Sequence, residues 1–158
     1  MRIGITGHSN LAPSAEPAVV QALTEVLADT PSPLVGVSCL ARGADQVFAR
    51  VVLDLGGQVE VVLPAADYRV RKVKPDNAVA FEELIGRAST VRTLPFEHSD
   101  RDAYMAASEA VLGTVDRMVA VWDGQPSDGH GGTGDVVAAA RERGLPVTVV
   151  WPTGAART

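Results

Sequence analysis

The sequence predicts a single α/β domain, in which a doubly wound, mostly parallel sheet of about six strands carries helices on both faces. Short β-branched runs alternate with longer stretches of helical periodicity along almost the whole chain. The strand runs are apolar without interruption, as in parallel strands that are buried on both faces. A length of 158 residues favours one domain. We expect this domain to span residues 1–152 and residues 153–158 to form a disordered tail.

Three strands and two helices are expected in the first half of the chain. The strands cover residues 3–6, 34–38 and 59–63, and the helices cover residues 13–29 and 43–55. Gly7 closes the first strand and Pro64 stops the third. Both helical stretches carry apolar residues at spacings of three and four. The segment Thr30-Pro31-Ser32-Pro33 ends the first helix, and Gly56-Gly57 offers the positive φ angles that favour the end of the second.

The second half repeats this alternation after a polar, basic segment, residues 65–76, which we interpret as a loop. Strands are expected at residues 90–94, 118–122 and 147–151, and helices at residues 77–87, 100–115 and 133–143. Asp100 provides an N-cap for the second of these helices. Gly144 ends the third. Between the last two helices, residues 123–131 form a loop rich in Gly, Pro, Ser and Asp.

Composition limits the partners and the compartment. Fourteen basic and 19 acidic residues give a net charge of −5, and aromatic residues make up only 4%. We therefore do not expect nucleic acid or an anionic membrane as a partner. The single cysteine, Cys39, excludes an internal disulfide, and the three histidines lack metal-ligand spacing, so no metal site is predicted. No apolar run approaches the ~20 residues that span a bilayer. A reduced, cytoplasmic protein is expected.

Three predicted strand ends carry glycine or small polar residues and lead into a helix. They are residues 4–10, residues 38–45, and residues 123–124 together with 129–135. In doubly wound sheets, ligands bind beyond the carboxyl ends of the strands, and glycine turns at helix N-termini favour phosphate. Short glycine turns are also ordinary connections in this fold class. The motifs G-x-G-x-x-G and G-x-x-x-x-G-K-[ST] are missing, which argues against a standard dinucleotide dehydrogenase or a P-loop ATPase.

Residues of these turns are the candidate ligand contacts. They are Gly7, His8, Ser38, Arg42, Gly43, Asp45, Asp123, Gly131, Gly132, Thr133 and Gly134. Backbone amides of the last three residues would hold phosphate. Asp123 would hold ribose hydroxyls, or else form an Asx turn before Gly124. Arg42 would reach a phosphate or lie in solvent, and Asp45 would contact the ligand or favour the helix start. Tyr104 would stack on a base or simply pack.

The same segments resemble the SLOG superfamily, which groups Smf/DprA-type DNA-processing proteins with LOG-type phosphoribohydrolases. Residues 38–45, SCLARGAD, resemble the S-G-L-A-x-G-x-D stretch of the DNA-processing branch. Residues 131–133, GGT, after 121–124, VWDG, resemble the glycine-rich phosphate loop of the superfamily. The opening GITGH at residues 4–8 resembles small single-domain and TRPM-associated members, which bind nucleotide-derived ligands. The resemblance implies a Rossmann-like nucleotide-binding domain and a homodimer or larger homo-oligomer.

The departures from these patterns decide between functions. LOG-type enzymes carry P-G-G-x-G-T-x-x-E with a catalytic glutamate, whereas here His130 takes the proline position and Val136 or Ala138 the glutamate position. The remaining candidate catalytic acids are Asp135 and Glu109. Similar members often have an arginine after the histidine of the opening, where this chain has Ser9.

The leading hypothesis is binding or sensing of a nucleotide or a nucleotide-derived ligand such as ADP-ribose, with no other cofactor. The alternatives are an N-glycosidase or phosphoribohydrolase acting on nucleoside monophosphates, and a single-strand DNA-binding module.

Overall fold

Six strands form one sheet in the computed structural model of the protein, which describes residues 1–127 and 132–158. The strands are β1 (Arg2–Gly7), β2 (Val35–Ser38), β3 (Gln58–Leu63), β4 (Thr90–Thr93), β5 (Arg117–Val121) and β6 (Val147–Val150). Their order is β4-β3-β2-β1-β5-β6, and all neighbouring strands are parallel. The expected α/β fold with a parallel sheet of six strands is confirmed.

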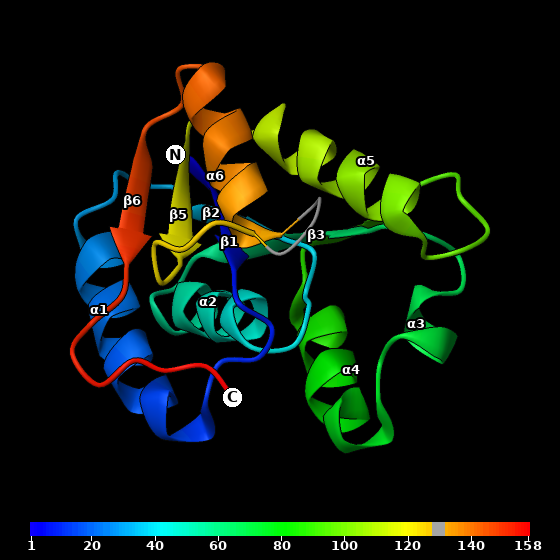
Figure 1. The fold of residues 1–158 in the computed structure, drawn as a ribbon, viewed down its shortest axis with the longest axis horizontal. Helices are drawn as coiled ribbons and strands as arrows, with labels where there is room; N and C mark the ends of the chain where they lie inside the picture. Colours follow the sequence, from blue (N-terminus) through cyan, green and yellow to red (C-terminus); the bar gives the residue numbers. More distant parts are fainter. Residues whose placement is uncertain (128–131) are drawn as a thin grey trace.

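Helices cover both faces of this sheet (Figure 1). They are η1 (Pro13–Ala15), α1 (Glu16–Ala28), α2 (Ala44–Asp54), α3 (Tyr68–Arg71), η2 (Pro75–Asn77), α4 (Ala78–Arg87), α5 (Arg101–Leu112) and α6 (Thr133–Glu142). On one face, side chains of α1, α2 and α4 bury a core around Phe48 and Phe81. On the other face, α5 and α6 pack through Val111 and Ala140 against Met118 of β5. The two apolar cores explain the continuous apolar runs of the strands.

The segment expected as a loop, residues 65–76, contains two short helices instead. The side chain of Tyr68 is buried in the larger core and holds this segment in place. The backbone carbonyl of Tyr68 accepts a hydrogen bond from the Lys72 amide, which closes the single turn of α3. One buried aromatic side chain thus orders a stretch that is otherwise polar and basic. This tertiary contact is invisible to a periodicity analysis, because four residues are too few to show a period.

The chain reverses its winding between β1 and β5. The strand order runs outward from β1 to β4 in one direction and from β5 to β6 in the other. The helix after β1 lies on one face of the sheet and the helix after β5 on the opposite face (Figure 1). The loops that leave the carboxyl ends of β1 and β5 therefore diverge. In open α/β sheets this point is where ligands bind.

In the segment 153–158, expected to be disordered, residues 156–158 lie along residues 10–12 in the structure. The Ala12 amide donates to the Ala156 carbonyl at 2.8 Å, and the Thr158 amide donates to the Asn10 carbonyl at 2.8 Å. A β-bridge joins Leu11 and Arg157 between them. These backbone contacts place the tail beside the carboxyl end of β1. None of the helices in the described ranges is long and apolar enough to cross a bilayer.

Candidate functional site

A pocket of about 490 Å³ opens at the carboxyl edge of the sheet, at the reversal point between β1 and β5. Its volume lies within the range of about 300–1,000 Å³ that is usual for small-molecule sites. Its walls come from the ends of β1, β2, β3 and β5, from the first turn of α6 and from α5. The predicted ligand contacts that line it are Gly7, His8, Asp45, Gly132, Thr133 and Gly134.

The first turn of α6 forms one end of the pocket. Gly132 is its N-cap residue and has no side chain to satisfy the helix amides. The Asp135 amide donates to Ser127 Oγ at 3.1 Å. The helix itself offers no acceptor to the amides of Thr133 and Gly134, and both residues line the pocket. This end of the pocket therefore carries backbone donors and a partial positive charge. Gly131, a further predicted contact, lies outside the described residues.

Glycine at position 132 has a packing reason as well. A Cβ atom there would lie 2.7 Å from Ser127 Oγ, and one on Gly134 would lie 3.1 Å from the same atom. The two glycines let residues 125–127 approach the start of the helix, which is how Ser127 reaches the Asp135 amide. The glycine-rich pattern at this turn thus serves the geometry of the pocket wall.

Asp123 forms the Asx turn that was one of its two interpretations. Its Oδ1 accepts a hydrogen bond from the Gln125 amide at 3.0 Å, and its Oδ2 accepts from Arg157 Nη1 at 3.2 Å. The hydrogen bond from Gln125 and the cation of Arg157 hold the pKa of this carboxyl below its usual range. Asp123 does not line the pocket.

The side chain of His8 accepts a hydrogen bond from the Asp123 turn. It is buried, its ring packs edge-on against Trp151 at 5.6 Å, and its Nε2 accepts from the Asp123 amide at 3.1 Å. Burial, followed by the nearby charge of Arg157, lowers the pKa of His8, which keeps the ring neutral at pH 7. His8 therefore acts as a fixed acceptor in the wall and leaves the positive charge of this region to Arg157.

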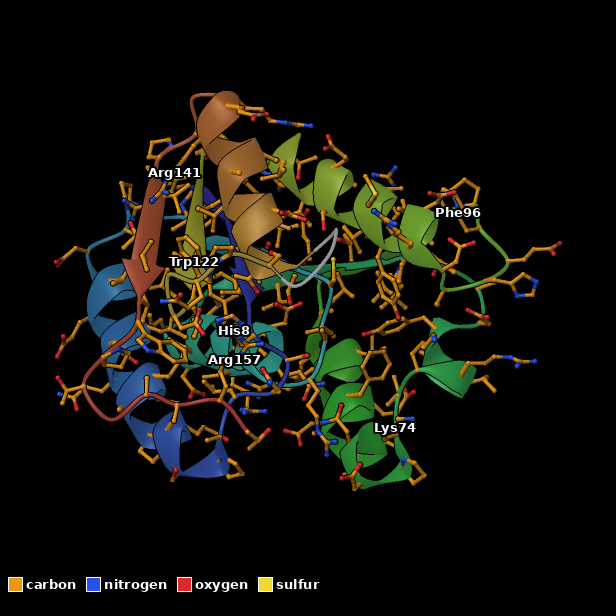
Figure 2. The ribbon with its side chains drawn as sticks, viewed as in Figure 1. His8, Lys74, Phe96, Trp122, Arg141 and Arg157 are labelled. Atoms are coloured by element: carbon orange, nitrogen blue, oxygen red, sulfur yellow. The ribbon has the colours of Figure 1, made fainter. Side chains whose placement is uncertain are left out.

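Arg157 is a pocket residue that the sequence analysis did not predict. Among the described residues it is the only Lys or Arg side chain that lines the pocket. Its Nε donates to Asn10 Oδ1 at 2.9 Å, and its Nη1 donates to Asp123 Oδ2. Figure 2 shows Arg157 beside His8, below Trp122. Because the residue lies in the tail expected to be disordered, no local pattern indicated its position.

Asp45 is the only carboxylate that lines the pocket within the described ranges. It lies in the first turn of α2, is 8% exposed, and accepts one hydrogen bond, from the Ala41 amide at 3.2 Å. Burial raises its pKa to about 7. Cys39 and Tyr68 line the same part of the pocket, and burial and then the charge of Asp45 raise the pKa of both groups. Poorly hydrated acids in a cleft are typical of functional sites.

Three predicted contacts have other positions. Ser38 is fully buried at the end of β2, where its Oγ accepts from the Leu40 amide at 3.0 Å. Arg42 pairs with Asp76 at 2.6 Å. Arg42 and Gly43 line a neighbouring pocket of about 520 Å³, which shares only Ser9 and Asn10 with the first among the described residues. The expected convergence of the three glycine turns is therefore incomplete, because the turn at Gly43 faces the neighbouring pocket.

Gly7 and Gly43 are explained by the packing of α2 against β1. A Cβ atom on Gly7 would lie 2.4 Å from Ala44 Cβ. Gly43 has a φ of +87°, and a Cβ atom there would lie 2.6 Å from the His8 carbonyl oxygen. The same carbonyl accepts from the Ala44 amide at 3.2 Å. The two glycines bring the start of α2, and with it Asp45, to the carboxyl end of β1.

The candidate catalytic acids lie outside the pocket. Asp135 and Glu109 line a groove between α5 and α6, and Glu109 pairs with Arg143 there. Neither lines the pocket at the carboxyl edge. The described residues contain no group of three or more His, Cys, Asp or Glu side chains that could hold a metal ion. The pocket thus combines donors, one cation and one buried acid.

Solved structures match this chain over almost its whole length. DprA from Streptococcus pneumoniae has a TM-score of 0.69 at 17% identity, covering 97% of this chain and 51% of that protein. DprA from Helicobacter pylori has a TM-score of 0.69 at 16% identity, covering 99% and 68%. The Moco carrier protein of Chlamydomonas rheinhardtii has a TM-score of 0.54 at 15% identity, covering 94% and 74%. The chain shares the Rossmann-like α/β fold of these proteins.

The Rossmann-like fold that the resemblance implied is therefore confirmed, and the likeness is one of structure. No protein-family model and no curated protein matches the sequence. The chain spans about half the length of the pneumococcal DprA, so it matches one part of that protein.

One expectation from composition is contradicted by these structures. The acidic composition argues against nucleic acid as a partner, but the Helicobacter pylori protein, which has the same fold, binds single-stranded DNA. A net charge of −5 is a property of the whole surface, whereas binding depends on the charge in a particular cleft. The composition of the whole chain therefore does not predict whether one cleft binds nucleic acid.

Proposed function

We propose that this protein binds a nucleotide or a nucleotide-derived small molecule, such as ADP-ribose, in the pocket at the carboxyl edge. The observation that carries the proposal is that the N-terminus of α6 and the side chain of Arg157 line the same pocket. Backbone amides at a helix start and a guanidinium are the two groups that proteins use most readily for phosphate. Both lie at the reversal point of the sheet, where this class of fold binds ligands.

Arg157 is held in a position suited to that task. Asn10 and Asp123 accept from two of its nitrogens and orient the guanidinium at the pocket. A guanidinium has five N–H donors, so these two contacts leave capacity for a phosphate. Asp123 thus supports ligand binding as a positioning residue, through Arg157. We therefore propose that Asp123 orients Arg157, in place of the direct contact with ribose that the sequence suggested.

Binding without turnover is the form of the proposal that the site supports. The two candidate catalytic acids line the groove between α5 and α6. Of the described carboxylates only Asp45 lines the pocket, and it lies at the start of α2 instead of next to the phosphate end. We therefore expect no free base to be released from AMP in the presence of the protein. Release of adenine that Asp135→Asn abolishes would favour the N-glycosidase instead.

Calorimetric titration tests the phosphate end directly. We expect saturable binding of AMP and ADP-ribose and at least ~10-fold weaker binding of adenosine, because hydrogen bonds to a charged group contribute about 1.5–3 kcal/mol. Arg157→Gln should remove most of the preference of the protein for AMP over adenosine. Arg143→Gln is the matched control, since Arg143 is similarly exposed (38% against 40%) but pairs with Glu109 outside the pocket. An absence of heat with all three compounds at millimolar concentration would refute the proposal.

Single-stranded DNA is the second candidate ligand, favoured by the Helicobacter pylori structure of the same fold. A gel-shift with an oligonucleotide at low salt separates it from a mononucleotide ligand. A strong shift that weakens with added salt, and that AMP does not compete away, would favour the nucleic acid. Competition by AMP would place the mononucleotide in the pocket first.

A further inference from the structure

The part of the pocket beside α3 and the first turn of α5 is aromatic. Tyr68 of α3 and Tyr104 of α5 both line it, together with Pro64 after β3. Their rings meet edge to face, with centroids 6.2 Å apart and an interplanar angle of 78°. Tyr68 is only 7% exposed and also packs against Phe81, whereas Tyr104 remains 39% exposed. Tyr104 is thus an aromatic surface available to a ligand and supported from behind by a buried ring.

The distance between the two ends suits a nucleotide. The α6 end follows β5, whereas Pro64 and Tyr68 at the aromatic end follow β3, with β1 and β2 between them. Tyr104 comes from α5, after β4, and belongs to this end through its ring contact with Tyr68. Neighbouring strands lie about 4.8 Å apart, so three steps span about 14 Å. A phosphate at the first end would place the base of an extended nucleoside monophosphate near the second. Asp45, which follows β2, lies along this path.

The surroundings of Asp45 favour a ligand that brings hydroxyl donors. The groups around the carboxyl are the Ala41 amide, which donates to Oδ2, and the side chains of Cys39 and Tyr68. No cation neutralises Asp45 in the described part of the pocket, since Arg157 pairs with Asp123. An ionised carboxyl in this position needs further donors, because burying a charge without them is costly. The two adjacent hydroxyls of a ribose provide such donors.

We propose that Tyr104 is the stacking surface for the nucleobase and that Asp45 binds the ribose hydroxyls, which makes a ribonucleotide the preferred class of ligand. This inference rests on the proposed function and deepens it. It adds a direction to the ligand, with phosphate at α6 and base at α5. It also predicts that the protein prefers ribonucleotides to 2′-deoxyribonucleotides, because the latter offer Asp45 one hydroxyl fewer.

The test compares AMP with ribose 5-phosphate and with 2′-deoxy-AMP as three probes in calorimetry. AMP should bind at least ~10-fold more tightly than ribose 5-phosphate, since stacking on an aromatic side chain is a substantial part of base recognition. Tyr104→Ala should abolish that difference, and Tyr104→Phe should keep it. Met105→Ala is the control, because Met105 follows on the same helix and is 47% exposed but lines the groove between α5 and α6. Thermal unfolding of each variant verifies that it is folded.

The ribose contact has its own comparison. Wild-type protein should prefer AMP to 2′-deoxy-AMP by about 5-fold or more, since a hydrogen bond to a charged group is lost with the 2′ hydroxyl. Asp45→Asn should reduce that preference, because it should weaken the binding of AMP, which has two ribose hydroxyls, more than that of 2′-deoxy-AMP, which has one. If AMP and ribose 5-phosphate bind equally, or if Tyr104→Ala changes nothing, the stacking surface is refuted while the proposed function stands. If none of the three probes binds wild-type protein, the proposed function fails and this inference with it.

Discussion

Replacing Asp45 by asparagine is expected to stabilise the fold at and above neutral pH, although the residue is buried. Burial raises the pKa of Asp45 to about 7 in the folded state from an ordinary value of 3.8. Between these two values the folded protein holds a proton that the unfolded chain has lost. The free energy of unfolding of the wild-type protein therefore falls as the pH rises through this window and stays low above it.

The size of the effect is at most about 4 kcal/mol at pH 8, because one pKa unit corresponds to about 1.4 kcal/mol. Asparagine cannot ionise and still offers an oxygen to the Ala41 amide, so the variant should avoid this loss. Urea unfolding of both proteins at pH 4 and pH 8 measures it. The advantage of Asp45→Asn should be small at pH 4 and large at pH 8, and an advantage that does not change with pH would contradict the explanation.

A second carboxyl serves as the control for this experiment. Asp76 is exposed, and its hydrogen bond with Arg42 lowers the pKa of its carboxyl. Asp76→Asn should therefore give no gain in stability on going from pH 4 to pH 8. Combined with the ligand titrations, Asp45→Asn is expected to be more stable and yet less selective for ribose. A buried acid that weakens the fold and serves binding is a common compromise in functional sites.

Gly43→Ala is expected to be strongly destabilising. The φ of +87° and ψ of −126° at this position belong to glycine, and a Cβ atom would lie 2.6 Å from the His8 carbonyl oxygen and 2.8 Å from that of Ser9. Both neighbours are backbone atoms, which cannot rotate away. We expect a loss of about 3–5 kcal/mol from strain and overpacking together, and a decrease of the melting temperature by about 10 °C.

Gly56→Ala is the comparison for a positive φ without a steric clash. Gly56 has nearly the same φ, +82°, but no atom lies within 4 Å of an added Cβ. Its substitution should therefore cost only the backbone conformation, about 1 kcal/mol. Thermal unfolding of the two variants side by side gives the comparison. If both variants lose the same stability, the clash of the added Cβ with the carbonyl oxygens of His8 and Ser9 does not contribute to the loss.

The elements of the fold were predictable because their signals are local. The β-branched runs gave all six strands, and the amphipathic stretches gave the five longer helices to within a few residues at each end. Parallel pairing followed from the alternation of strand and helix, and the glycine turns at strand ends pointed to the edge where the pocket lies. The first turn of α6 illustrates this, since Gly132, Thr133 and Gly134, which were predicted from one glycine turn, all line the pocket.

The parts of the site that escaped prediction depend on contacts between distant residues. Arg157 reaches the pocket because Asn10, 147 positions earlier in the chain, accepts from it. Tyr68 is buried because its ring packs against Phe81. The burial of Asp45 depends on how closely α2 approaches β1, which Gly7 and Gly43 set through tertiary contacts. A prediction from short sequence segments cannot detect these contacts, because the residues that make them are far apart in the chain.

The docking of the tail on residues 10–12 has a consequence for the timing of assembly. Both cores can form once β6 has joined the sheet, but Arg157 comes after that strand. During synthesis the pocket therefore acquires its cation only when residue 157 has left the ribosome, after the rest of the domain can already fold. A protease that clips the chain just after Trp151 would spare the residues of both cores and would remove Arg157, the proposed phosphate contact, together with the backbone pairing of the tail with residues 10–12.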